Sequence, residues 1–339
     1  MSTLQSIWFL LIGVLLLGFS VLDGFDLGVG FWSLLTPDSR DRGRLLAAIG
    51  PVWDGNEVWL LTGGGALFAA FPHVYATVFS GFYLALILVL FCLILRAVAI
   101  EFRNKEPSLR WRRTWDLVFG ITSALAMLLF GVALGNILRG IPLDATRTYR
   151  GTFFTLLNPY ALLVGLTGFA MLATHGALYA LLKTDGELAD RARTWARTGW
   201  TAFIVFLMVA NVATAATQKH LLANLLAHPV LWLVPAAALA SVAAIGVFLR
   251  RGSIREAFLA SGLSIALLWA QVGVGLYPTI VPALGHPGLS LTIRNASSSK
   301  LTLEVMLAIA LLGMPLVVGY TAWVYKTFAG KVAEGAEGY

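Results

Sequence analysis

The chain has 339 residues, of which 58% are hydrophobic and only 12% are charged, and its mean hydropathy is +0.81. Soluble domains carry about one quarter charged residues, so this composition excludes an ordinary water-soluble globular protein. The net charge of +7 indicates membrane topology rather than nucleic-acid binding, because the sequence has no separate basic domain that could hold a nucleic acid.

Nine segments are long and apolar enough to cross a bilayer, which takes about 20 residues each. In chain order they are residues 7–33, 50–71, 74–101, 114–138, 158–182, 197–217, 229–249, 255–280 and 301–328. No run alternates polar and apolar residues as a membrane barrel strand does. We therefore expect an all-α, polytopic membrane protein with nine transmembrane helices. The first segment lacks a basic start and contains acids, so it is expected to be a retained span and not a cleaved signal peptide.

The first two segments carry carboxylates. Asp23 and Asp26 lie inside the first segment, and Asp54 and Glu57 open the second. A carboxylate in hydrocarbon costs roughly several kcal/mol unless it is paired, protonated or facing water. Within each motif the two acids are three residues apart and so share a helix face. These acids therefore indicate an ion or proton route, a counter-charge for a ligand, or a structural ion pair.

Lys and Arg lie mostly on one side of the predicted bundle. If all nine segments cross, 17 of them flank one side and 6 the other, and Arg96 lies inside the third segment. The positive-inside rule then places the N-terminus in the periplasm and the C-terminus in the cytoplasm. This orientation gathers the acids in the cytoplasmic half of the first four segments. Glu101, Lys105 and Asp116 lie in the same half, and Glu101 and Lys105 are spaced as an i,i+4 pair.

Metal and haem ligands are scarce. The single Cys92 rules out an internal disulfide and a Cys-based metal site, and we expect it to be a small buried hydrophobe. Haem iron takes His, Met, Cys or Tyr as an axial ligand. Of the five histidines only His175 lies within a segment, where both a hydrogen-bonded packing role and a ligand role are open. We expect no metal site and a chain poor in haem.

Taken together, these motifs resemble subunit II of cytochrome bd-type quinol oxidase. The similar stretches run through the whole chain, at residues 23–30, 51–60, 63–72, 79–83, 96–105, 111–116, 131–136, 156–160, 295–303 and 320–325. The first two are the most specific. The loop at residues 218–228 is short, which is typical of the compact, cyanide-insensitive-oxidase-like branch.

The resemblance implies one membrane domain over residues 1–339. It would contain two four-helix units, at 7–138 and 158–280, and a peripheral helix at 301–328. The implied partners are subunit I, which carries two haems b and one haem d, a small single-helix accessory subunit, and a possible structural quinone. The implied complex lies in the bacterial inner membrane, oxidises quinol and reduces O2 to water. It takes protons from the cytoplasm and generates proton-motive force without pumping.

For the site, the resemblance assigns the positions of Asp54, Glu101 and Lys105 to a proton-uptake route, with no catalytic residue in this subunit. Further candidates are Asp23, Asp26, Glu57, Arg96 and Asp116, together with Trp59 for an oxygen path or a quinone contact. Two alternatives stay open. One is a stand-alone proton-coupled transporter, although transporters of that kind show inverted repeats that are not evident here. The other is a scaffold whose acids pair with Arg96 and Lys105.

Overall fold

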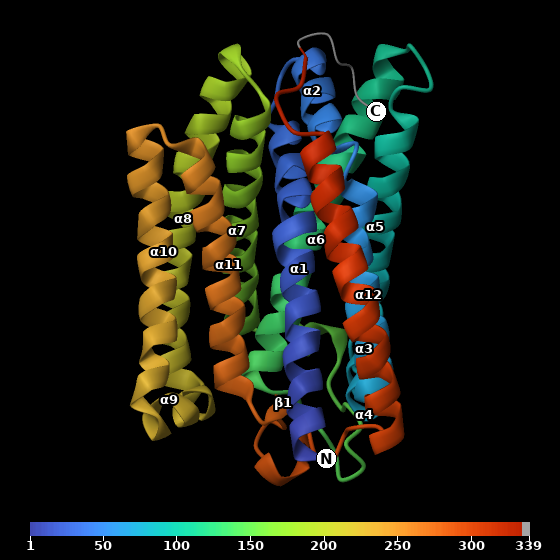
Figure 1. Ribbon diagram of the computed structural model, residues 1–339, viewed down its shortest axis with the longest axis vertical. Coiled ribbons are helices and arrows are strands. Elements are labelled where there is room, and N and C mark those ends of the chain that lie inside the picture. Colours follow the sequence, from blue (N-terminus) through green and yellow to red (C-terminus); the bar gives the residue numbers. More distant parts are fainter. Residues whose placement is uncertain (334–339) are drawn as a thin grey trace.

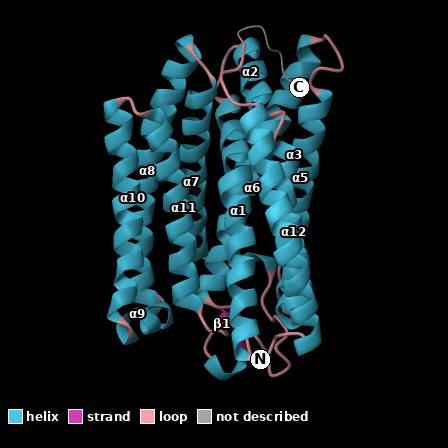
Figure 2. Cartoon of the chain, in the orientation of Figure 1, coloured by secondary structure: helices cyan, strands magenta, loops and turns pink. Residues whose placement is uncertain are grey.

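The computed structural model describes residues 1–333, which form a bundle of long, roughly parallel helices (Figures 1 and 2). The α-helices are α1 (Ser2–Leu34), α2 (Ser39–Ile49), α3 (Trp53–Ala70), α4 (Pro72–Gly81), α5 (Tyr83–Phe102), α6 (Leu109–Arg139), α7 (Pro159–Lys183), α8 (Gly186–Thr217), α9 (Ala223–Ala227), α10 (Leu233–Arg251), α11 (Ile254–Leu276) and α12 (Lys300–Thr327). Two short strands, β1 (Thr279–Val281) and β2 (Leu291–Thr292), pair in antiparallel fashion between α11 and α12. The predicted all-α class is confirmed.

Eight helices in the described part of the chain are long and apolar enough to cross a membrane: α1, α5, α6, α7, α8, α10, α11 and α12. The second predicted segment corresponds to α3, which is not among them, because Asp54, Asn56 and Glu57 occupy its first turns and lower its hydropathy. The third predicted segment is built from α4 and α5, which meet at Phe82. The membrane-spanning helical fold is confirmed, and the count of nine stays a prediction.

Some helix boundaries differ from the predicted segments. α8 begins at Gly186, well before residue 197, because its charged and amphipathic first turns continue the helix beyond the apolar stretch. The amphipathic α2 was not predicted, since hydropathy detects apolar windows and not short polar helices. Asp38 caps this helix by accepting a hydrogen bond from the backbone N–H of Arg40 at 2.9 Å.

The centre of the bundle is α1, which packs against α3, α6, α7 and α11. Gly28 of α1 crosses Gly176 of α7 so closely that a Cβ on Gly176 would lie 2.5 Å from the Gly28 Cα. Close approach through small residues is common between membrane helices. Trp32 fixes the same seam by donating its indole N–H to the Ala173 carbonyl at 2.7 Å. Because α1 and α6 both pack on α7, the division into units at 7–138 and 158–280 stays a prediction.

α12 lies at the edge of the bundle, against α1 and α3 (Figure 1). Only 6% of its apolar window is buried. Two hydrogen bonds attach its ends to the bundle. The Trp8 indole N–H donates to the Leu303 carbonyl at 2.9 Å, and the Tyr325 hydroxyl donates to the Asn56 side-chain oxygen at 2.9 Å. The helix is therefore peripheral but held at both ends.

Candidate functional site

Asp23 of α1 and Arg96 of α5 form an ion pair in the interior of the bundle. Both side chains are 0% exposed. The two terminal guanidinium nitrogens of Arg96 each donate to one oxygen of Asp23, and the Nη1–Oδ2 distance is 3.0 Å. This two-pronged geometry is the strongest form of a carboxylate–guanidinium contact. Arg96 thus supplies a counter-charge for Asp23 in the interior of the bundle.

Asp26 lies one turn further along α1 and has a different partner. One of its oxygens accepts a hydrogen bond from the Asn56 Nδ2 at 2.7 Å, and the other is buried without a hydrogen-bond partner among the described residues. Asn56 also donates to the Leu22 carbonyl and accepts from Tyr325. The amide of Asn56 therefore connects α1, α3 and α12 at the acid cluster.

The α3 acids connect this cluster to the surface. Glu57 is 19% exposed, and its Oε2 lies 3.6 Å from Arg96 Nη1. Asp54, one turn earlier, is exposed in the first turn of α3. The burial of these carboxyl groups thus increases in steps: Asp54 is exposed, Glu57 is half-buried and Asp23 is fully buried. Successive carboxyl groups of this kind are the elements from which proton relays in membranes are built.

Glu101 and Lys105 are both exposed near the end of α5. The helix ends at Phe102, so Lys105 lies in the following loop instead of one helical turn beyond Glu101. In the described part of the chain the predicted ion pair between them is not formed. Beyond Arg103 the chain forms a turn, in which the Lys105 N–H donates to the Phe102 carbonyl at 3.1 Å, and the Arg103 side chain is buried against Asp116.

Asp116 belongs to a separate cluster of charges. It is bound by Arg103 Nε at 2.5 Å and by Arg42 Nε at 2.8 Å. Arg103 also donates to the Ser39 carbonyl at 2.9 Å. These contacts join α2, α5 and α6. The sequence marked Asp116 but not its partners, because Arg42 and Arg103 lie in loops and short helices where charges are ordinary.

Trp59 and His175 are both used in packing. A Cβ on Gly18 would overlap the Trp59 ring, so this ring fills the seam between α1 and α3. The His175 nitrogens lie 2.9 Å from the Ser261 hydroxyl and 3.0 Å from the Val21 carbonyl, and its ring stacks on Phe258. With both nitrogens engaged, His175 does not fit an axial-ligand role. The described residues contain no cluster of three or more His, Cys, Asp or Glu side chains that could hold a metal ion.

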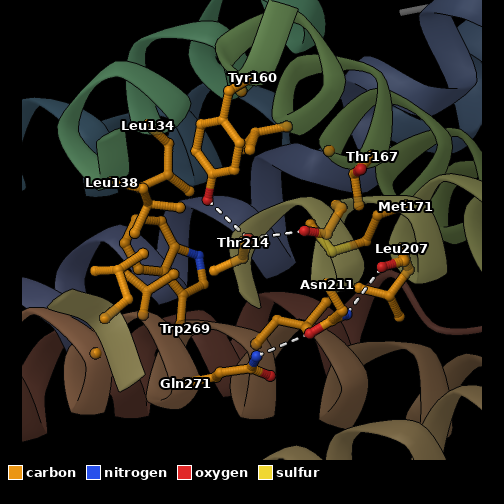
Figure 3. A pocket seen from close by; sticks show the side chains of 18 of the residues that line it. Leu134, Leu138, Tyr160, Thr167, Met171, Leu207, Asn211, Thr214, Trp269 and Gln271 are labelled. Atoms are coloured by element: carbon orange, nitrogen blue, oxygen red, sulfur yellow. Dashed lines mark hydrogen bonds between the residues drawn. The ribbon is translucent and has the colours of Figure 1, made fainter. Parts of the chain in front are cut away.

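A separate, mostly apolar pocket lies between α6, α7, α8 and α11, with a volume of about 170 Å³ (Figure 3). Polar groups gather within it. The Tyr160 and Thr214 hydroxyl oxygens are 2.8 Å apart, and Gln271 Nε2 donates to Asn211 Oδ1 at 3.2 Å. Apolar walls with a few convergent polar groups are typical of small-molecule sites.

Comparisons with known proteins agree with one another. A family model described as cytochrome bd terminal oxidase subunit II matches residues 4–328. Cytochrome bd-I ubiquinol oxidase subunit 2 of Escherichia coli (strain K12) is 38% identical, over 98% of this chain and 96% of that protein. Cytochrome bd ubiquinol oxidase subunit 2 of Bacillus subtilis (strain 168) is 35% identical, over 98% of each chain. The solved bd oxidase from Geobacillus thermodenitrificans shares the fold, with a TM-score of 0.79 and 17% identity over 96% of this chain and 98% of that one.

Proposed function

Because this chain belongs to the cytochrome bd terminal oxidase subunit II family, we propose that it serves as subunit II of a quinol oxidase of the bacterial inner membrane. In that role it joins a subunit I, and the complex oxidises quinol and reduces O2 to water. The observation that carries the assignment is a family match over nearly the full length. The relatives described above are oxidase subunits, and none of them is a transporter. A single-helix accessory subunit is a further proposed partner.

We assign the haems, two of type b and one of type d, to subunit I. His175 is the one histidine within a long apolar helix of the described chain, and both of its ring nitrogens already have protein partners. Haem supplies the electron transfer and oxygen chemistry of such a complex. The residues of this chain then serve to bind subunit I, to pack the helices and to move protons.

The proposed proton route begins at the cytoplasmic surface with Asp54, Glu101 and Lys105. It continues through Glu57 towards the Asp23–Arg96 pair. Graded burial supports this order, because Asp54 is exposed, Glu57 is 19% exposed and Asp23 is fully buried. Asp26 lies beside this line and is linked to it by Asn56. Asp116 is assigned instead to the clamp with Arg42 and Arg103, since both of its oxygens face a guanidinium group.

Asp54→Asn tests the route, because the amide has nearly the shape of the carboxyl group but does not relay protons. We expect the purified complex to assemble with an unchanged haem spectrum and to turn over at least about tenfold more slowly, with an altered pH–rate profile. Glu256→Gln is the matched control, since it removes an acid from the first turn of α11. Full activity in Asp54→Asn would exclude the route. Loss of assembly would favour the scaffold alternative.

We propose that subunit I covers the outward face of α3. Exposed residues recur on that face at helical spacing, at Asp54, Val58, Leu61, Gly65 and Phe68. The helix falls short of the hydropathy of a lipid-exposed span, so another protein surface is the better neighbour. A cysteine at Gly65 should crosslink to subunit I, and a cysteine at Val247 on α10 should not. Equal crosslinking at both positions would contradict this placement.

The pocket between α6, α7, α8 and α11 is the proposed place for a structural quinone. Its apolar walls suit an isoprenoid tail, and Tyr160 and Gln271 offer hydrogen-bond donors to ring carbonyl oxygens. Solvent extraction of the purified complex should recover less quinone from a Tyr160→Phe/Gln271→Leu variant than from the unchanged protein. Equal recovery from the two proteins would mean that no quinone is bound in this pocket.

A further inference from the structure

The outward face of α6 changes from apolar to basic near the N-terminal end of the helix. Leu117, Ile121 and Leu125 are 45–49% exposed and form a stripe of apolar side chains along one side of the helix. Arg113 and Arg110 continue the same stripe by one and two further turns, and both are exposed. A lipid-facing stripe that becomes basic marks the depth at which the hydrocarbon ends and the headgroups begin.

Within residues 1–333, Arg110 and Arg113 differ from Arg42 and Arg103 in having no counter-charge. Arg42 and Arg103, close by in the fold, are both bound to Asp116. In the described structure the guanidinium groups of Arg110 and Arg113 form neither an ion pair nor a side-chain hydrogen bond, and both residues are exposed. They are therefore available to a ligand outside the chain.

Aromatic side chains mark the same depth. The Trp111 and Trp115 rings are 5.6 Å apart, and Phe102 lies 5.9 Å from Trp115. Trp111 donates its indole N–H to the Phe102 carbonyl at 2.8 Å, which ties the end of α5 to the start of α6. Rings of this kind gather at the membrane–water interface. The arginines thus lie beside interfacial aromatics and above a lipid-facing stripe.

We propose that Arg110 and Arg113 bind the phosphate groups of an anionic membrane phospholipid. The guanidinium fork matches phosphate oxygens, and two such groups one helical turn apart suit the two phosphates of a diphosphatidyl lipid. The acyl chains of that lipid would lie along Leu117 and Ile121. This continuity between the basic and apolar parts of the stripe favours a lipid over a free phosphate ion, which has no use for the apolar part.

The test uses the whole purified oxidase, freed of bound lipid and titrated with cardiolipin, phosphatidylglycerol or phosphatidylcholine while binding is followed by native mass spectrometry. Losing both charges should weaken cardiolipin binding roughly 30-fold in Arg110→Gln/Arg113→Gln. An Arg110→Lys/Arg113→Lys variant should recover part of it. The control Arg147→Gln/Arg294→Gln removes two charges from the opposite end of the bundle and should change binding less than about twofold. An unchanged haem spectrum in each variant confirms assembly.

Three results would overturn the proposal. The first is cardiolipin binding that is equal in the unchanged complex and in the Gln/Gln variant. The second is displacement of the lipid by millimolar inorganic phosphate, which would make this a phosphate site. The third comes from a photo-crosslinker placed at Leu117. It should capture lipid, and capture of subunit I would mean that protein covers this face.

Discussion

Asp23 and Arg96 illustrate how much depends on two side chains. Both are completely buried, so removing one leaves the other charge without compensation, at a cost of about 3–5 kcal/mol. Arg96→Leu should therefore lower the thermal midpoint of the complex strongly, as followed by loss of the haem absorbance. The double variant Asp23→Asn/Arg96→Leu should recover a substantial part of that loss. Purely additive losses in the double variant would show that the two groups do not act as a pair.

Asp144, in the loop between α6 and α7, has its carboxylate held by local donors. It accepts hydrogen bonds from the Thr146 hydroxyl at 2.7 Å, the Thr148 backbone N–H at 2.9 Å and the Arg150 guanidinium at 2.8 Å. The Thr146 hydroxyl, followed by the Thr148 N–H, holds the pKa of Asp144 well below its ordinary value of 3.8. The ionised form therefore stabilises the folded loop.

The sign of the pH dependence follows from this lowered pKa. The stabilisation by Asp144 is complete above the ordinary pKa of 3.8 and is lost as pH falls through the lower pKa of the folded loop. Asp144→Asn should speed hydrogen exchange of the Thr148 amide at neutral pH, and the difference from the unchanged protein should shrink in strong acid. A difference that persists unchanged at the acid end would mean that the carboxylate charge is not what orders the loop.

Among the elements, the crossing of α1 and α7 is the most demanding contact. A Cβ on Gly28 would lie 2.8 Å from the Gly176 Cα, where neither backbone has room to move. Gly28→Ala should therefore destabilise the bundle by about 1–3 kcal/mol and reduce the yield of assembled oxidase. Gly13→Ala is the matched control on the same helix, because nothing lies within 4 Å of its Cβ position. Similar yields for the two variants would contradict the packing argument.

Long apolar helices could be predicted from the sequence because the bilayer demands about 20 apolar residues for each crossing. α3 shows the limit of that reasoning. Its polar residues lower its mean hydropathy below that of a predicted span. One of them, Asn56, is nevertheless buried, because its amide has hydrogen-bond partners on α1 and α12. Those partners are distant in sequence, so no local pattern reveals them. α2 was missed for the opposite reason, since a short amphipathic surface helix has no apolar window.

For the acid motifs, the sequence predicted the positions of the carboxyl groups but not their partners. Spacing showed that Asp23 and Asp26 share a helix face, and the isolated Arg96 indicated a counter-charge. Spacing did not show that Asp23 forms an ion pair with Arg96 whereas Asp26 accepts a hydrogen bond from Asn56. These partners depend on how α3 and α5 pack on α1. The i,i+4 spacing of Glu101 and Lys105 misled for a different reason, since α5 ends at Phe102 and Lys105 lies in the turn that follows.

At the scale of the whole molecule, the two ends of the bundle differ in charge. α2 and the loop after α5 lie at the end of the bundle where α12 ends, and the N-terminus and the β1–β2 hairpin lie at the other (Figure 1). With 17 basic residues flanking the first end and 6 the second, the positive-inside rule predicts that the first end lies in the cytoplasm. We therefore propose a periplasmic N-terminus, and in this orientation the proposed proton route opens on the cytoplasmic side that supplies its protons.

Cysteine labelling in a Cys92→Ala background tests this orientation, because the buried Cys92 is the one native thiol. Ser108 is exposed in the loop after α5, and Gly288 is exposed at the opposite end, with nothing within 4 Å of its Cβ position. In sealed right-side-out vesicles, a membrane-impermeant maleimide should label Gly288→Cys but not Ser108→Cys. Opening the vesicles should expose Ser108→Cys to the reagent. Labelling at position 108 before opening would reverse the topology, and it would also move the acid cluster to the periplasmic side, where it could not take up protons from the cytoplasm.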